Sequence, residues 1–271
     1  MSNILSLYHS GSGSTKTVAQ LFKTRLDKFH NVEMQRIHQN FDYGKLPNYD
    51  FILIGFPTYF WTPSTSISEF VTNMFVYERP ITAFIYTTCG TYNGNSLRIL
   101  IKRLFKKNVT SVAYATIKCP ASDYFLFPIS NTSMFQYEKG LSDKIDSSVN
   151  KINELIRTAD TSYKVPAFKL YVPLNNLLIY PGKKWFYFYR DRLHNLKERC
   201  INCNQCVENC HHNCWSEGEN FPSYQSGNCE FCLGCVHNCP QKAIIFSQGM
   251  ADKSRFNKKF YSKFLKQFSE K

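Results

Sequence analysis

Short apolar runs alternate with amphipathic stretches along residues 1–118, which is the pattern of a parallel sheet covered by helices. The apolar runs predict five strands, at Ile4–Tyr8, Val32–Ile37, Phe51–Gly55, Ile81–Thr87 and Val112–Ile117. The amphipathic stretches, the last of them further along the chain, predict helices at Thr15–Phe29, Ser66–Phe75, Asn95–Phe105 and Met134–Arg157. Because strands and helices alternate, we expect an α/β fold with a doubly wound, five-stranded parallel sheet.

The pattern changes between residues 160 and 199. Pro166, Pro173, Pro181 and Gly182 interrupt any long element there, and the aromatic run Trp185–Tyr189 follows. Because the segment is not rich in Gly and Ser, we expect a connector that packs rather than a flexible linker. A chain of 271 residues favours two domains of unequal size. The predicted divisions are an α/β domain at 1–160, a packed connector at 161–195, a cysteine-rich domain at 196–249 and a basic C-terminal tail at 250–271.

Eight of the 11 cysteines form two copies of the spacing C-x2-C-x2-C-x3-C, which is the spacing of bacterial two-cluster ferredoxins. Two intervening residues make a tight loop that aims three sulfurs at three corners of one cubane, so the fourth sulfur serves the other cluster. The first predicted [4Fe-4S] cluster has the ligands Cys200, Cys203, Cys206 and Cys239. The second predicted cluster has the ligands Cys229, Cys232, Cys235 and Cys210.

Zinc is the competing interpretation, because zinc sites also use paired C-x2-C. A zinc ion needs only four ligands and gains nothing from a third and fourth cysteine at fixed offsets, so clusters are favoured. Pro240 follows the second motif, whereas His211 takes the corresponding place after the first. Cys214 is surplus to eight ligands and is expected to be a free thiol. For His211 and His212, tuning of a cluster potential and no role both stay open.

A second candidate site begins with the loop Ser10–Thr15, directly after the first predicted strand. Hydroxyls and free backbone N–H groups at a helix N-terminus form a pocket for a phosphate. The loop is neither a Walker motif nor G-x-G-x-x-G. Two further loops, Pro57–Pro63 and Thr87–Gly94, follow the third and fourth strands at the carboxyl edge of the sheet, where ligands of such folds bind. Their aromatic residues either sandwich a flat ring or simply cover the sheet edge.

Together the three loops predict an FMN site. Its candidate residues are Ser10, Ser12, Gly13, Ser14, Thr15, Pro57, Thr58, Tyr59, Phe60, Trp61, Thr87, Thr88, Cys89, Gly90, Tyr92, Asn93 and Gly94.

The N-terminal half resembles a flavodoxin, and the whole order resembles the flavodoxin–ferredoxin fusion family of anaerobes. The resemblance rests on Ser10–Thr15, Gly55–Tyr59, Thr87–Gly90 and the cysteine motifs. It implies a flavodoxin-like FMN domain followed by a small α+β ferredoxin domain with two [4Fe-4S] clusters. It also implies that Ser10, Ser12, Ser14 and Thr15 hold the phosphate, with Tyr59, Phe60 and Trp61 bordering the isoalloxazine and Tyr92 stacking on its other side.

One departure from the family concerns the loop after the third strand. Many flavodoxins have a glycine there, which lets a peptide flip and offer its carbonyl to the protonated flavin N5 of the semiquinone. Residues 57–63 contain no glycine, and a flip into positive φ costs more without one. The sequence therefore leaves semiquinone stabilisation open.

The formal charge of +13 is unevenly distributed. Residues 200–249 carry −3, and two clusters of about −2 each would lower this to roughly −7, whereas the tail 250–271 carries +5. The tail interleaves basic and aromatic residues, as nucleic-acid and anionic-membrane binders do. Docking onto the acidic cysteine-rich segment is the simpler explanation, so we expect no nucleic acid as a partner.

The leading hypothesis is an electron-transfer flavoprotein that exchanges electrons with separate redox proteins. The alternative is an iron–sulfur flavin reductase that acts on a quinone, a nitro compound or oxygen, so enzymatic activity stays open. No acid–base or nucleophilic constellation stands out, and no sequence feature defines a nicotinamide site. The strand-like start lacks a secretory leader, and no run approaches the roughly 18 apolar residues that span a bilayer. We therefore expect a cytoplasmic protein.

Overall fold

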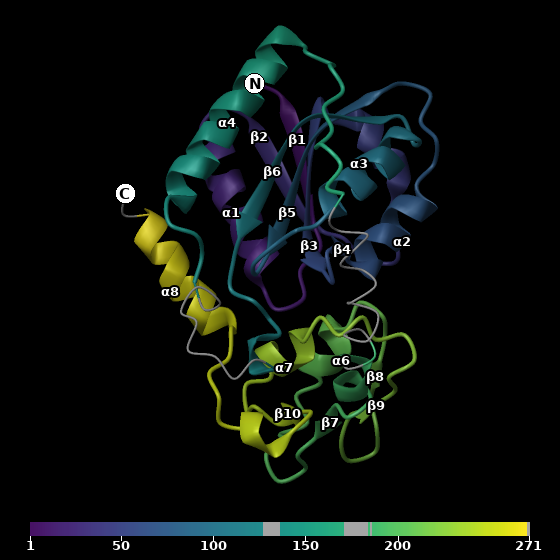
Figure 1. Ribbon diagram of the computed structural model, residues 1–271, viewed down its shortest axis with the longest axis vertical. Helices are drawn as coiled ribbons and strands as arrows, with labels where there is room; N and C mark the ends of the chain where they lie inside the picture. Colours follow the sequence, from purple (N-terminus) through teal and green to yellow (C-terminus); the bar gives the residue numbers. More distant parts are fainter. Residues whose placement is uncertain (127–135, 171–183, 185, 270–271) are drawn as a thin grey trace.

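The computed structural model describes residues 1–126, 136–170, 184 and 186–269, except for the side chains of 267–269 (Figure 1). A five-stranded parallel sheet occupies the N-terminal part in the order β2-β1-β3-β5-β6. The strands are β1 Asn3–Tyr8, β2 Asn31–Arg36, β3 Phe51–Tyr59, β5 Ile81–Cys89 and β6 Val109–Lys118. This is the flavodoxin-like strand order, and it confirms the predicted doubly wound α/β fold.

Helices cover both faces of the sheet (Figure 1). The first face packs on α1 Ser14–Leu26 and α4 Leu141–Thr158, and the second on α2 Thr65–Asn73 and α3 Ser96–Phe105. Neighbouring strand residues point to opposite faces, so Ile4 lies in the first core and Leu5 in the second. Strands β1, β3 and β5 are buried on both faces and read as continuous apolar runs, which is why the sequence predicts them well.

The observed boundaries differ from the expected ones at a few ends. Strand β3 continues to Tyr59 because it pairs antiparallel with β4 Thr62–Pro63. Helix α1 ends at Leu26, and the side chain of Phe29 is exposed rather than in the core. Helix α4 begins after Gly140, which has φ 71°; the expected start at Met134 lies outside the described residues. The expected connector residues Pro173, Pro181, Gly182 and Trp185 also lie outside them.

Short elements build the C-terminal part. They are the antiparallel pairs β7 His194–Asn195 with β10 Ile244–Ile245 and β8 Trp215–Ser216 with β9 Ser223–Tyr224, and the helices α6 Gln205–Asn209 and α7 Gly234–Asn238. The described residues also contain the 3-10 turns η1 Tyr43–Asn48, η2 Tyr124–Leu126 and η4 Gln248–Met250. We call residues 196–249 the cysteine module. It lies below the carboxyl ends of the strands in Figure 1.

The C-terminal tail returns to the α/β part. Helix α8 Lys258–Ser269 lies beside α1, and its aromatic residues join the core that α1 and α4 cover (Figure 1). The expectation that the tail docks on the cysteine module holds for the residues before α8, where the Phe256 N–H donates to His237 and Arg199 pairs with Asp252. Helix α8 itself packs on the α/β part through its apolar side chains. None of the helices in the described ranges combines the length and apolar character that a bilayer-spanning helix needs.

Candidate functional site

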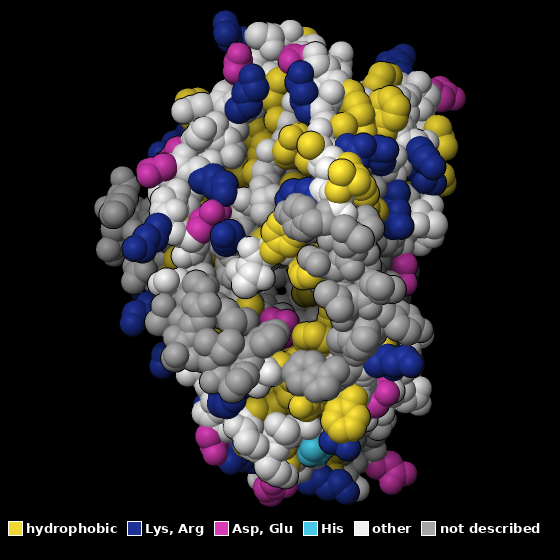
Figure 2. Space-filling model, viewed as in Figure 1, with side chains coloured by type: hydrophobic (Ala, Val, Ile, Leu, Met, Phe, Trp, Pro, Cys, Tyr) yellow, Lys and Arg dark blue, Asp and Glu magenta, His cyan; other side chains and the backbone are white. Residues whose placement is uncertain are grey.

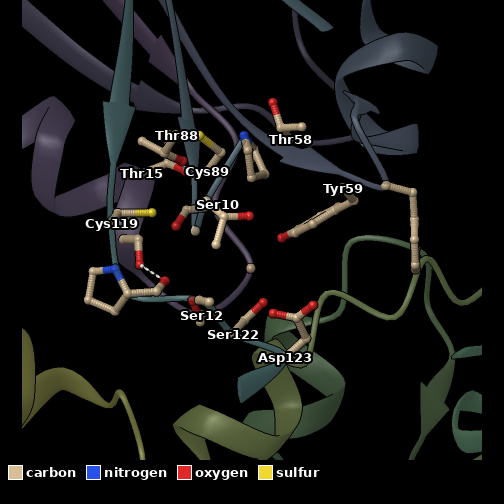
Figure 3. Close-up of a pocket in the computed structure, with 18 of the residues that line it drawn as sticks. Ser10, Ser12, Thr15, Thr58, Tyr59, Thr88, Cys89, Cys119, Ser122 and Asp123 are labelled. Carbon is tan, nitrogen blue, oxygen red and sulfur yellow. Dashed lines mark hydrogen bonds between the residues drawn. The ribbon is translucent and has the colours of Figure 1, made fainter. Parts of the chain in front are cut away.

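A cavity of about 550 Å³ lies at the carboxyl edge of the sheet (Figure 3). The loops after β1, β3, β5 and β6 line it, and Phe186 and Phe231 complete the wall from the C-terminal half. Figure 2 shows a hollow at this level of the molecule, bordered in part by hydrophobic side chains. The four loops meet because the carboxyl ends of parallel strands share one edge.

Most of the residues predicted for the flavin site line this cavity. They are Ser10, Ser12, Ser14, Thr15, Pro57, Thr58, Tyr59, Phe60, Trp61, Thr88, Cys89, Gly90 and Tyr92. Four predicted residues, Gly13, Thr87, Asn93 and Gly94, are not among its lining residues. Thr87 instead bonds to Thr58, with 2.8 Å between the two hydroxyl oxygens, and the Asn93 amide donates to the Thr116 hydroxyl at 3.0 Å.

The loop before α1 has the features of an anion pocket. The Ser10 hydroxyl is buried, and no described residue forms a hydrogen bond with it. In the part of the chain that the structure describes, the backbone N–H groups of residues 11–15 have no acceptor either. These free donors lie at the positive end of the α1 dipole. Thr15 and Thr88 connect the loop to β5 through a 2.8 Å contact between their hydroxyls.

The aromatic loop has an unusual backbone. Phe60 and Trp61 have φ of 49° and 63° and form the two-residue turn between β3 and β4. Positive φ at both central residues is typical of a type I′ turn, which normally holds Asn and Gly, and it costs about 1–3 kcal/mol for each non-glycine residue. Residues 57–63 contain no glycine, and the backbone nevertheless adopts positive φ at Phe60 and Trp61.

Packing holds this turn in place. The Trp61 and Tyr92 rings lie 6.0 Å apart edge to face, and Phe60 meets Phe186 at 4.7 Å. Gly94 has φ 55°, and a Cβ there would lie 2.5 Å from the Cβ of Trp61. Gly94 therefore allows the two aromatic loops to touch, although it does not line the cavity.

The loop 119–123 is the part of the cavity that the sequence-based prediction missed. Cys119, Pro120, Ala121, Ser122 and Asp123 all line the cavity (Figure 3). The loop follows the last strand of the sheet, so the rule that located the other loops applies to it as well; it lacks the aromatic and Gly/Ser composition that drew attention to them. Burial raises the pKa of the Cys119 thiol to about 12 and raises the pKa of Asp123.

The second cysteine motif packs directly on the loop Ser10–Thr15. A Cβ at Gly11 would lie 2.8 Å from the Cβ of Cys232, and a Cβ at Gly234 would lie 2.8 Å from the Gly11 carbonyl oxygen. The neighbouring Phe231 is part of the cavity wall. Burial, reinforced by Cys232, raises the pKa of Tyr59 well above its usual value. The cavity and this motif are therefore in contact.

The cysteines predicted for the first cluster surround a common space. Cys200, Cys203, Cys206 and Cys239 all line one small cavity between the motifs. The backbone N–H of Ala243 donates to the Cys239 sulfur at 3.2 Å, a contact that suits a thiolate ligand. Among the described residues, no three His, Cys, Asp or Glu side chains form a site for a single metal ion.

Cys214 connects two cysteines predicted for the second cluster. It is a free cysteine, and its backbone N–H donates to the Cys210 sulfur at 3.2 Å. Hydrogen bonding from Cys214 lowers the pKa of Cys210 to about 6 and the pKa of Cys229 to about 7. The Phe231 N–H also donates to the Cys229 sulfur at 3.3 Å. Both sulfurs are thus surrounded by donors that favour a thiolate.

Arg255 is a buried cation beside the module. It is 5% exposed, and none of its guanidinium nitrogens has a hydrogen-bond partner among the residues that the structure describes. The guanidinium lies 4.8 Å from the Phe125 ring. Burial lowers the pKa of Arg255, and Tyr124 and Cys239 oppose that effect. A buried cation without an acceptor fits an anionic group at the adjacent cysteines.

Glu230 connects the module to the α/β part. Its carboxylate, 3% exposed, accepts a bond from the Ser66 hydroxyl at 2.8 Å and lies 3.1 Å from His9 Nε2. His212 Nε2 lies 3.6 Å from the other carboxylate oxygen. Although burial opposes it, hydrogen bonding to His212 and His9 holds the pKa of Glu230 well below its usual value. These contacts fix the second motif against α2 and β1.

No protein-family model and no curated protein matches the sequence. Among solved structures, oxidised flavodoxin 2 from Bacillus cereus is 21% identical with a TM-score of 0.44, over 56% of this chain and 98% of that chain. A WrbA-like flavodoxin from Agrobacterium tumefaciens is 17% identical with a TM-score of 0.41, over 59% of this chain and 100% of that chain. At these TM-scores the similarities add nothing to the strand order, which by itself defines the N-terminal part of this chain as flavodoxin-like.

Proposed function

We propose that this chain is an electron-transfer iron–sulfur flavoprotein that passes electrons between FMN and two [4Fe-4S] clusters and on to partner redox proteins. The single observation that carries the proposal is the contact between the cavity and the second cysteine motif, where Cys232 packs on Gly11 and Phe231 forms part of the cavity wall. This contact brings the two candidate cofactor sites together in one chain.

The flavin site in this proposal uses the cavity loops. Ser10 and the free N–H groups of residues 11–15 hold the phosphate without a basic side chain, because the helix dipole and several donors share its charge. Tyr59, Trp61 and Tyr92 border the ring system. Cys89 and Cys119, whose thiol pKa values burial raises to about 11 and about 12, stay protonated and neutral beside it.

The cluster sites use the eight motif cysteines. Cys200, Cys203, Cys206 and Cys239 would hold the first cluster, and Cys229, Cys232, Cys235 and Cys210 the second. Arg255 and the N–H donors at Cys229 and Cys239 compensate their negative charge. When bound, FMN exchanges one or two electrons and each cluster exchanges one, while the chain supplies binding, orientation and electrostatics.

Anaerobic reconstitution with iron, sulfide and FMN tests the proposal. We expect about eight irons and one FMN per chain, and a reductive titration in which EPR detects reduced [4Fe-4S] signals. Fewer than about six irons per chain, or tightly bound zinc in their place, would contradict the two-cluster assignment. Rapid turnover of a quinone by the reconstituted chain without a second protein would instead favour the reductase alternative.

A further inference from the structure

Tyr261, in the first turn of α8, reaches the loop that begins α1. Its hydroxyl oxygen lies 2.9 Å from Ser14 Oγ and 3.5 Å from Ser12 Oγ. The side chain is 6% exposed, so these contacts are shielded from water. Residues almost 250 positions apart thus meet at the proposed phosphate site.

The Tyr261 ring also touches the backbone of this loop. Gly13 has φ 123°, and a Cβ at this position would lie 2.5 Å from Cε2 of Tyr261. Both the backbone conformation and the close approach of the ring exclude a side chain there. Gly13 is therefore required for packing against Tyr261. This gives it a structural role in the loop, although it does not line the cavity.

The hydrogen bonds around Ser14 have a defined direction. The Ser14 hydroxyl donates to the Pro120 carbonyl at 3.3 Å, and a serine hydroxyl has only one proton. Tyr261 must then be the donor to Ser14 Oγ, which leaves its own oxygen free to accept from Ser12. The Ser14 carbonyl accepts a bond from the Tyr137 hydroxyl at 3.1 Å. Ser14 is thus held on both its side chain and its backbone.

The segment before α8 is fixed to the cysteine module. The Phe256 N–H donates to His237 Nδ1 at 3.0 Å, and the two rings stack 5.0 Å apart at 7°. Because Nδ1 accepts, Nε2 carries the proton and donates to the Ser122 carbonyl at 2.9 Å. His237 lies between two motif cysteines, and Ser122 lines the flavin cavity. One residue therefore connects the module, the tail and the cavity.

Contacts before and after Tyr261 fix the first turns of α8. The Asn257 side chain accepts from the Phe260 N–H at 3.1 Å, which is an N-terminal cap. One turn beyond Tyr261, Phe264 stacks on Tyr137 at 4.1 Å and 27°. The helix is consequently anchored on both sides of the Tyr261 contact.

We propose that Tyr261 is a positioning residue of the flavin phosphate loop, so that the helix following the cysteine module helps to set the affinity for the phosphate group. The inference rests on the proposed function. Tyr261 acts through the loop: its hydroxyl fixes Ser14 and its ring supports Gly13, which keeps the N–H groups of residues 11–15 aimed into the cavity.

The test compares two flavins that differ only in the phosphate. For Tyr261→Phe in the full chain with its clusters reconstituted, FMN affinity should fall about tenfold, whereas riboflavin affinity should stay within about twofold. Tyr77→Phe is the matched control, because its buried hydroxyl donates to the Tyr43 carbonyl at 3.0 Å and neither residue lines the cavity. Both affinities of this control should equal those of the unaltered chain. Fluorescence titration measures all of them.

The possible outcomes separate this inference from the function on which it rests. Equal losses for both flavins, or no loss for either, would overturn the positioning role of Tyr261 and leave the FMN site intact. An unaltered chain that binds neither flavin would overturn both proposals. If Tyr261→Phe does not fold, Ser14→Ala removes the other half of the same bond and should give the same selective loss for FMN; its absence would overturn the inference.

Discussion

The two cysteine motifs share one backbone conformation but face different surroundings. Asn202 and Phe231, at matching positions, have φ of 52° and 55°, and Asn204 and Leu233 have φ of 53° and 58°. Asparagine tolerates this left-handed region, whereas most other side chains cost about 1–2 kcal/mol there. The second motif nevertheless has large residues at both places, and Phe231 and Leu233 are buried. The cysteine spacing therefore determines the backbone conformation of the loop. The residues between the cysteines determine which surface the loop packs against.

The two motifs also differ in the exposure of their side chains. Ile201 is 60% exposed, whereas Glu230 at the matching position of the second motif has a side chain only 3% exposed. Cys203 is exposed, while Cys232 packs on Gly11. We expect partner proteins to approach the first motif, because the second motif faces the cavity at the sheet edge.

Removing a ligand from each motif should give the largest difference. On the proposed assignment each variant loses one ligand of one cluster, so Cys203→Ala and Cys232→Ala should each lower the iron content from about eight to about four per chain. Only Cys232→Ala should also weaken FMN binding, since only Cys232 touches the cavity loop. Iron analysis and flavin titration on the same preparations measure both effects.

The surplus cysteine provides the control, and Cys214→Ser should keep about eight irons. Equal FMN binding by the two ligand variants would contradict the assignment of the second motif to the cavity side.

The buried carboxylate of the second motif should give the next largest effect. Glu230→Gln removes the charge that His9 and His212 face, and it should lower the free energy of unfolding by about 3 kcal/mol. Glu217→Gln near the first motif is the matched control, because Glu217 is exposed and should cost less than about 1 kcal/mol. Anaerobic urea unfolding compares the two variants. Similar losses would mean that burial does not distinguish the motifs.

The sequence predicts those parts of the molecule that depend on local pattern. The apolar runs of β1, β3 and β5 are visible because these strands are buried on both faces, and the loop Ser10–Thr15 is visible because it follows the first strand. Contacts between distant segments leave no such local trace. Nothing around Tyr261 points to Ser14, and nothing in loop 119–123 distinguishes it from an ordinary connection. The packing of Cys232 on Gly11 likewise follows from the docking of the module.

Gly11 tests this docking from the side of the α/β part. In Gly11→Ala the new methyl group would lie 2.8 Å from both Cys232 Cβ and the Tyr59 hydroxyl oxygen and 3.0 Å from the Cys232 carbonyl oxygen, so the loop and the module must move apart. We expect a loss of about 1–3 kcal/mol in unfolding free energy and weaker FMN binding. Gly249→Ala is the control, since no described residue apart from its chain neighbours comes within 4 Å of the added methyl group. Urea unfolding and flavin titration measure the pair. An unchanged Gly11→Ala protein would mean that the two surfaces do not touch in solution.

The smallest effect should come from the backbone of the exposed motif. Asn202→Ala puts a less suitable residue at φ 52° and should cost about 1 kcal/mol in unfolding free energy, whereas Asn202→Gly should leave it almost unchanged. The iron content should stay the same in both variants, because the cysteines remain. A loss well above about 2 kcal/mol in Asn202→Ala would mean that the Asn202 side chain has a role beyond its conformation. The expected small loss would instead show that the first motif uses asparagine for conformation alone, whereas the second motif accepts strain at the same place in order to pack Phe231 against the cavity.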